Sequence, residues 1–110
     1  MEYKFRIWLT QNNNKVFGEG PLKLLKKIEE LGSLRQAAIS MEMSYSKAWK
    51  IIKNIEEELQ IPILERHIGG KKGGGSTITK EARDFIHKYE VLKSKIETMI
   101  QKEIQSFLKD

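Results

Sequence analysis

The sequence contains no cysteine, which excludes disulfide bonds, thiol catalysis and thiolate metal sites. It also contains no apolar run near the roughly 18 residues that a membrane-spanning helix needs. The first residues, MEYKFRIWLTQ, lack the apolar stretch and the small residues of a signal peptide. We therefore expect a cytoplasmic protein that makes no membrane contact.

Groups able to catalyse a reaction are also scarce. His67 and His87 are isolated, with no carboxylate at the spacing typical of a metal or acid–base site, and no nucleophile has a credible base. The segment GGKKGGGST is superficially similar to a phosphate-binding P-loop, but Glu65 stands where that motif needs its first glycine. Lys72 stands where it needs serine or threonine. We expect no enzymatic activity, no cofactor and no metal site.

The chain has an excess of basic residues. There are 20 Lys and Arg against 15 Asp and Glu, a formal net charge of +5, which favours nucleic acid or another anionic partner. With 110 residues, the chain has the length of one domain with a single core, and we assign residues 1–110 to it.

An alternation of apolar and polar residues over 3–10 predicts a half-buried strand with Tyr3, Phe5, Ile7 and Leu9 on one face. The following QNNNK predicts a tight turn, and VFG predicts a short return strand. These elements would form an N-terminal β-hairpin.

Three helices should follow, over about 20–60. Pro21 suits the start of the first and Gly32 its end, with an apolar stripe of Leu24, Leu25, Ile28 and Leu31. Ser33 and Ser44 are suited to cap the second and third helices. Two short helices separated by about three residues, the second one lysine-rich, are typical of a helix-turn-helix.

Pro62 ends the third helix, and two short strands then flank a segment with five glycines and two lysines in seven positions. This predicts a hairpin, or wing, over about 61–79. A final helix over about 79–109 contains neither proline nor glycine and would extend roughly 45 Å. The expected fold is mainly α with small β elements: a winged helix-turn-helix with an N-terminal β-hairpin and a long C-terminal helix.

The third helix separates apolar from polar residues. A helical wheel places Ala48, Ile51, Ile52, Ile55 and Leu59 in one sector, and serines and lysines opposite. Such donors suit base edges and phosphates in a major groove, although lysines at this spacing also occur on ordinary solvated helix faces. The wing glycines would let its backbone approach DNA closely while its basic residues neutralise phosphates. The predicted DNA contacts are Ser44, Tyr45, Ser46, Lys47, Lys50, Lys53, Arg66, Gly70, Lys71 and Lys72.

Two aromatic residues lie on the flank of this helix. We expect Trp49 to pack in the core or at a hinge, with its indole N–H finding a partner. The Tyr45 ring either packs or supports a hydroxyl that reaches a phosphate.

The last helix carries apolar residues at alternating steps of three and four, close to a heptad pattern. Its second half has few partners left within so small a chain, so we expect a second copy to cover it, giving a homodimer. The alternative is a helix folded back on its own hairpin. The predicted dimerisation residues are Leu92, Ile96, Met99, Ile100, Ile104 and Phe107.

The segments GSLRQAAISMEMSYSKAWKII and LERHIGGKKGGGSTIT resemble the N-terminal DNA-binding domain of the ModE family, molybdate-responsive regulators related to the LysR-type helix-turn-helix. The resemblance covers roughly residues 3–90 and implies a winged-helix dimer with residues 44–59 as the recognition helix. Ala82 stands where the family usually has glycine. Full-length members continue into oxyanion-binding modules, and nothing here resembles one, so a separate protein would sense any effector.

The leading hypothesis is a homodimeric, sequence-specific transcriptional regulator that binds double-stranded DNA without its own molybdate-binding module. One alternative is a winged-helix module for protein interaction. Another is a nonspecific architectural DNA-binding protein.

Overall fold

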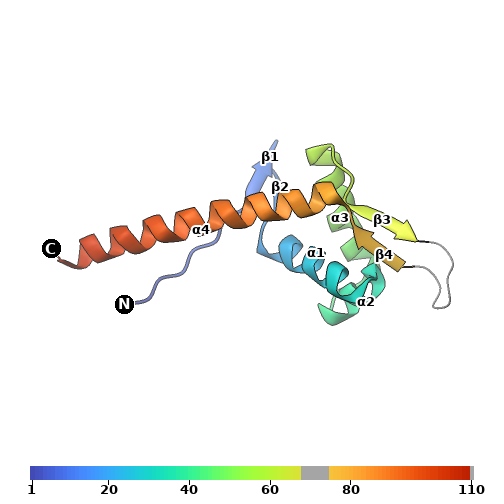
Figure 1. The fold of residues 1–110 in the computed structure, drawn as a ribbon, viewed down its shortest axis with the longest axis horizontal. Coiled ribbons are helices and arrows are strands. Elements are labelled where there is room, and N and C mark those ends of the chain that lie inside the picture. The colour runs from blue at the N-terminus through green and yellow to red at the C-terminus, as the bar shows by residue number, and fades with distance from the viewer. Residues whose placement is uncertain (68–74, 110) are drawn as a thin grey trace.

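The computed structural model describes residues 1–67 and 75–109, which form four helices and two antiparallel hairpins (Figure 1). The elements follow in the order β1 (Leu9–Gln11), β2 (Asn14–Phe17), α1 (Glu19–Leu31), α2 (Leu34–Ser40), α3 (Tyr45–Leu59), β3 (Leu64–His67), β4 (Gly75–Ile78) and α4 (Lys80–Lys109). The molecule measures 63 × 28 × 24 Å, and α4 accounts for its length because it extends well beyond the other elements. The winged helix-turn-helix architecture is as predicted.

The helix-turn-helix unit is delimited by the residues that the sequence indicates. Gly32 ends α1 with a left-handed backbone, φ 70°, which glycine adopts without steric cost. The hydroxyl oxygen of Ser33 accepts the N–H of Gln36 at 3.1 Å, and that of Ser44 accepts the N–H of Lys47 at 3.0 Å. Both serines therefore cap their helices as predicted.

The core lies between the three short helices, the wing and the first turns of α4. Phe17 packs edge-on against Phe85 and Tyr89, with ring centroids 4.9 and 5.0 Å apart. Two details of α1 differ from the prediction. The helix begins at Glu19, and Leu31 at its C-terminal end is exposed. The buried residues of the core cluster include Leu24, Leu25, Ile28, Leu34, Ala37, Ala38, Ala48, Ile52, Ile55, Ile63, Ile78, Ala82 and Ile86.

The strand predicted over residues 3–10 is wrong in extent, because β1 begins only at Leu9. The alternation itself is present: odd-numbered side chains from 3 to 9 are half-buried and even-numbered ones from 4 to 10 are exposed. Residues 3–8 run beside α4 rather than beside a strand of the described chain (Figure 1). The Tyr89 hydroxyl donates to the carbonyl oxygen of Ile7 at 3.1 Å, which fixes this segment to the helix.

The predicted N-terminal hairpin is present, and its turn residues Asn12 and Asn13 have positive φ angles of 52° and 64°. The hairpin is bonded to α3. The side-chain amide of Asn54 donates to the carbonyl oxygen of Lys15 at 2.9 Å, and that of Asn14 donates to Asn54 at 2.7 Å.

The wing strands pair antiparallel, from Leu64 opposite Ile78 to His67 opposite Gly75. The backbone N–H of Ser76 donates to the carbonyl oxygen of Gly32 at 2.9 Å, so β4 is bonded to the end of α1. The wing is thereby attached to the helix-turn-helix unit.

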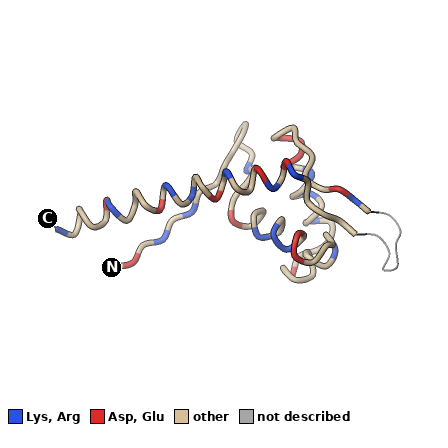
Figure 2. Tube along the Cα trace, in the orientation of Figure 1, with Lys and Arg blue, Asp and Glu red and all other residues tan. Residues whose placement is uncertain are grey.

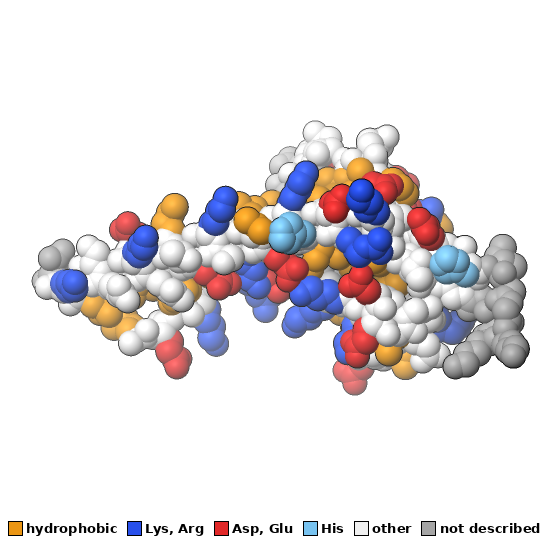
Figure 3. All heavy atoms as spheres, in the orientation of Figure 1, with side chains coloured by type: hydrophobic (Ala, Val, Ile, Leu, Met, Phe, Trp, Pro, Cys, Tyr) orange, Lys and Arg blue, Asp and Glu red, His pale blue; other side chains and the backbone are white. Residues whose placement is uncertain are grey.

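Helix α4 begins at the wing and then leaves the core. Thr79 accepts the N–H of Ala82 at 3.0 Å, which caps the helix near the predicted start. Ala82, Ile86 and Tyr89 are buried, and beyond them the helix contains no further buried residue up to Lys109. Hydrophobic side chains are visible along this extension in Figure 3.

Candidate nucleic-acid interface

Helix α3 presents three of the predicted contact residues together. Ser46, Lys47 and Lys50 are exposed. Ala48 and Ile52 of the same helix are buried and point toward the core. The exposed residues belong to the N-terminal half of the helix. Their hydroxyl and ammonium groups can donate to acceptors in a groove or on a phosphate backbone.

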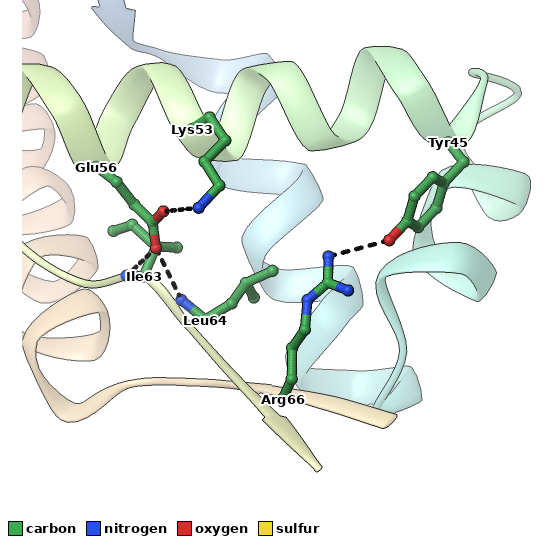
Figure 4. A network of polar contacts seen from close by, with 6 residues as sticks. All are labelled: Tyr45, Lys53, Glu56, Ile63, Leu64 and Arg66. Atoms are coloured by element: carbon green, nitrogen blue, oxygen red, sulfur yellow. Dashed lines mark hydrogen bonds and ion pairs between the residues drawn. The ribbon is translucent and has the colours of Figure 1, made fainter. Parts of the chain in front are cut away.

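Tyr45 links the start of this helix to the wing. Its hydroxyl oxygen accepts a hydrogen bond from Nη2 of Arg66, on β3, at 3.1 Å (Figure 4). On α2, the Arg35 guanidinium carbon lies 5.1 Å from the centroid of the Tyr45 ring, a cation–π contact. One tyrosine therefore gathers two cations from two other elements.

The Lys53 side chain makes two contacts within α3. Its ammonium lies 3.2 Å from the Glu56 carboxylate (Figure 4). It also lies 5.2 Å from the centroid of the Trp49 ring. The side chain remains 46% exposed, so it is accessible to an anion. Glu56 also accepts the backbone N–H of Ile63 at 2.9 Å, which ties α3 to the start of the wing.

The expectation that Trp49 packs in the core is wrong, because 39% of its surface is exposed. It lines a hollow of about 370 Å³ between α3 and β3. The helical wheel places Trp49 beside the core, but at this position the facing element is the short β3, whose Leu64 and Arg66 leave the indole open on one side.

A carboxylate at the acidic C-terminal end of α3 is hydrogen-bonded to the N-terminal hairpin. The side-chain amides of Gln11 and Asn14 donate to the Glu58 carboxylate at 3.1 and 3.2 Å. The N-terminal hairpin thus occupies a carboxylate that would repel a polyanion. Figure 2 shows acidic residues interspersed with basic ones along the trace. The net charge alone therefore does not locate a surface that could bind an anion.

Three other residues of the wing were predicted to contact DNA. They are Gly70, Lys71 and Lys72, and they lie outside the described residues. The base of the wing is described, and there His67 Nε2 lies 2.9 Å from the Thr77 hydroxyl oxygen, across the two strands. Arg66 is therefore the predicted wing residue whose surroundings are known.

The predicted dimerisation residues share one stretch of α4. Leu92, Met99 and Phe107 are 38%, 63% and 73% exposed. Ile96, Ile100 and Ile104 are half-buried. Partly and largely exposed apolar residues at this density are typical of an interaction face.

Over residues 1–67 and 75–109, no group of three or more His, Asp or Glu residues is placed to hold a metal ion. Among the helices of these residues, none combines the length and the apolar character that a membrane span requires.

Arg35 was missed by the sequence analysis. The sequence alone gives little reason to expect a contact there, because one arginine in a short capped helix is also an ordinary solvated residue. Only the fold shows that the second position of α2 lies beside the start of α3.

The capped α2–α3 pair, the exposed polar face of α3 and the attached hairpin define a winged helix-turn-helix domain. A model of the lysR family of bacterial regulatory helix-turn-helix proteins matches residues 21–83. The chain belongs to this family, and within it the matched region is a ModE-like helix-turn-helix domain.

Two relatives and two solved structures illustrate this placement. The chain is 38% identical to the transcriptional regulator ModE of Haemophilus influenzae over 71 residues, which is 64% of this chain and 28% of that protein. It is 30% identical to the molybdenum transport protein ModE of Azotobacter vinelandii over 97 residues, 88% of this chain and 36% of that protein. The chain thus spans about a third of the length of these relatives.

The crystal structure of a BenM_DBD/benA site 1 DNA complex superimposes with a TM-score of 0.55 at 26% identity. It covers 78% of this chain and 94% of that one. A second complex, of BenM_DBD with catB site 1 DNA, gives a TM-score of 0.54 at 24% identity and shares the fold.

Proposed function

We propose that this chain is a sequence-specific DNA-binding transcriptional regulator. The observation that carries the proposal is the exposure of Ser46, Lys47 and Lys50 on one face of α3, next to a wing whose Arg66 is bonded to Tyr45. Relatives named as transcriptional regulators and a solved neighbour in a DNA complex support it.

In this proposal the N-terminal half of α3 enters the major groove. Ser46 and Lys47 reach base edges, and Lys50 and Lys53 contact bases or phosphates beside them. Ser44 holds the helix start, because its hydroxyl oxygen already accepts the N–H of Lys47. The wing, with Gly70, Lys71 and Lys72, lies along the adjacent backbone.

The proposed active form is a homodimer. The exposed stretch of α4 from Leu92 to Phe107 supplies an apolar face, and a second copy brings the same face by two-fold symmetry. Two recognition helices in a two-fold dimer bind a pseudo-palindromic site. We assign these 110 residues DNA binding and no part in sensing an oxyanion.

Selection from a pool of randomised duplexes, at two salt concentrations, tests the proposed function. The expected result is enrichment of an inverted repeat that is bound by two protomers. Salt-sensitive binding without enrichment would contradict sequence-specific regulation and indicate an architectural role. No binding at low salt would overturn DNA binding and favour a protein partner.

A further inference from the structure

Arg35 on α2, Tyr45 on α3 and Arg66 on β3 come from three different elements, and both arginines contact Tyr45. Arg66 Nη2 lies 3.1 Å from the Tyr45 hydroxyl oxygen, and the Arg35 guanidinium carbon lies 5.1 Å from the centroid of the same ring. The two guanidinium groups are therefore separated by no more than one tyrosine side chain with a contact at each end.

Two like charges held against one side chain repel each other, and an anion bound between them would offset that repulsion. Within residues 1–67 and 75–109, neither Arg35 nor Arg66 is ion-paired with a carboxylate; the ion pairs found there involve lysines. Both arginines are exposed, so a ligand can reach them. The described residues therefore supply no carboxylate partner for either guanidinium.

The donors match a phosphate. A guanidinium offers parallel N–H groups that fit two oxygens of one phosphate, and it is always charged. The Tyr45 hydroxyl oxygen accepts from Arg66, which leaves its own hydrogen free to donate to a phosphate oxygen. The ring meanwhile holds the second guanidinium against its face.

We propose that Arg35, Tyr45 and Arg66 form a single site for one DNA backbone phosphate, at the junction of α2, α3 and β3. Tyr45 is the positioning residue of this site, and it reads no base. This inference rests on the proposed DNA binding and adds to it a residue, Arg35, and a shared target. A phosphate held there fixes the recognition helix and the wing in one orientation on the duplex.

The test uses the duplex selected from the random pool, with the phosphates of one half-site replaced one at a time by neutral methylphosphonate. For the unaltered protein, replacement at one position should weaken binding by several-fold. For Arg35→Gln and for Arg66→Gln, replacement at that same position should have little further effect. Lys88→Gln, which removes one exposed charge from α4, is the matched control and should keep the full sensitivity.

Tyr45 is tested in the same assay. Tyr45→Phe keeps the ring that Arg35 covers and removes the acceptor of Arg66, so the Arg66→Gln change should cost less in this background than in the unaltered protein. Tyr45→Ala should reduce the effect of both arginine changes. Circular dichroism spectra unchanged from the unaltered protein show that each variant is folded.

If Arg35→Gln and Arg66→Gln each lose sensitivity to methylphosphonate at a different phosphate, the single site is overturned. Full sensitivity retained in Arg35→Gln would overturn it as well. Failure of the unaltered protein to bind any duplex would instead overturn the proposed function, and this inference with it.

Discussion

The carboxylate of Glu56 on α3 accepts the backbone N–H of Ile63 at 2.9 Å, in the link between that helix and the wing. Helix α3 is therefore bonded directly to the segment that leads into the first wing strand. Removing the Glu56 side chain leaves the Ile63 N–H without this partner. Because that side chain is only 20% exposed, water replaces it poorly.

We expect Glu56→Ala to lower the free energy of unfolding by about 1.5–3 kcal/mol, the usual effect of deleting one partner of a charged hydrogen bond. Glu56→Gln is the matched control. It keeps an oxygen acceptor for Ile63 and loses only the ion pair with Lys53, so it should cost less than half as much. Urea unfolding measures both, and a Glu56→Ala protein as stable as the original would contradict the role of this bond.

A second stability prediction concerns Gly75 at the start of β4. A Cβ atom built there would lie 2.8 Å from the carbonyl oxygen of Gly32, a backbone atom that cannot move aside cheaply. Gly75→Ala should therefore destabilise the protein by about 1–3 kcal/mol. Gly20→Ala is the control: nothing lies within 4 Å of its Cβ, and the change within α1 should stabilise by roughly 0.5 kcal/mol. Equal effects of the two changes on thermal unfolding would contradict the prediction.

Stability should fall at alkaline pH. Burial, with a smaller contribution from the Glu19 charge, raises the pKa of the Tyr89 phenol above its usual 10.0. A hydrogen bond to Glu19 raises the pKa of the Lys93 ammonium above 10.5. In both cases the folded state favours the protonated form, so stability is complete below the pKa of the unfolded chain and is lost as the pH rises through the folded pKa.

Unfolding measurements from pH 8 to 12 test this prediction. Glu19→Gln should flatten the alkaline decline, because the Glu19 charge contributes to both shifts. Unfolding free energies that stay constant above pH 10 in the original protein would contradict the prediction.

Dimerisation through α4 predicts that a charge on its apolar face separates the protomers. Met99→Glu should convert a dimer into a monomer in sedimentation equilibrium, because it would bury a carboxylate among apolar side chains. Gln101→Glu adds the same charge at an exposed polar position and should leave the dimer intact. A monomeric original protein at micromolar concentration would contradict this dimer.

The wing and the recognition helix should respond differently to mutation. Lys71→Ala combined with Lys72→Ala should weaken binding equally on all sequences, and each lost phosphate contact should reduce the salt slope by about 0.9. Ser46→Ala or Lys47→Ala should instead change which base is preferred at one position. An unchanged salt slope would count against the wing contact, and a uniform loss would make Ser46 and Lys47 nonspecific anchors.

Apart from the start of α1, the helix boundaries were predictable because they depend on local chemistry. Ser33 and Ser44 cap their helices, and Gly32 takes the left-handed conformation that few other residues tolerate. The separation of exposed lysines from buried isoleucines on α3 follows from helical periodicity alone.

Features that depend on distant partners were not predictable. Residues 3–8 have the alternation of a strand, but whether a strand pairs depends on its neighbour, and here that neighbour is α4. Trp49 has a core-flank position, yet the small wing strand leaves it partly open. The contact of Arg35 with Tyr45 arises from the packing of α2 on α3, which no local motif encodes.

The most direct test of DNA recognition by α3 is methylation protection on the selected duplex, since N7 of guanine faces the major groove. We expect protected guanines in two clusters, one per half-site, with protection in each cluster weakened by Lys47→Ala. Protection of minor-groove positions alone, or uniform protection that Lys47→Ala leaves unchanged, would contradict entry of α3 into the major groove.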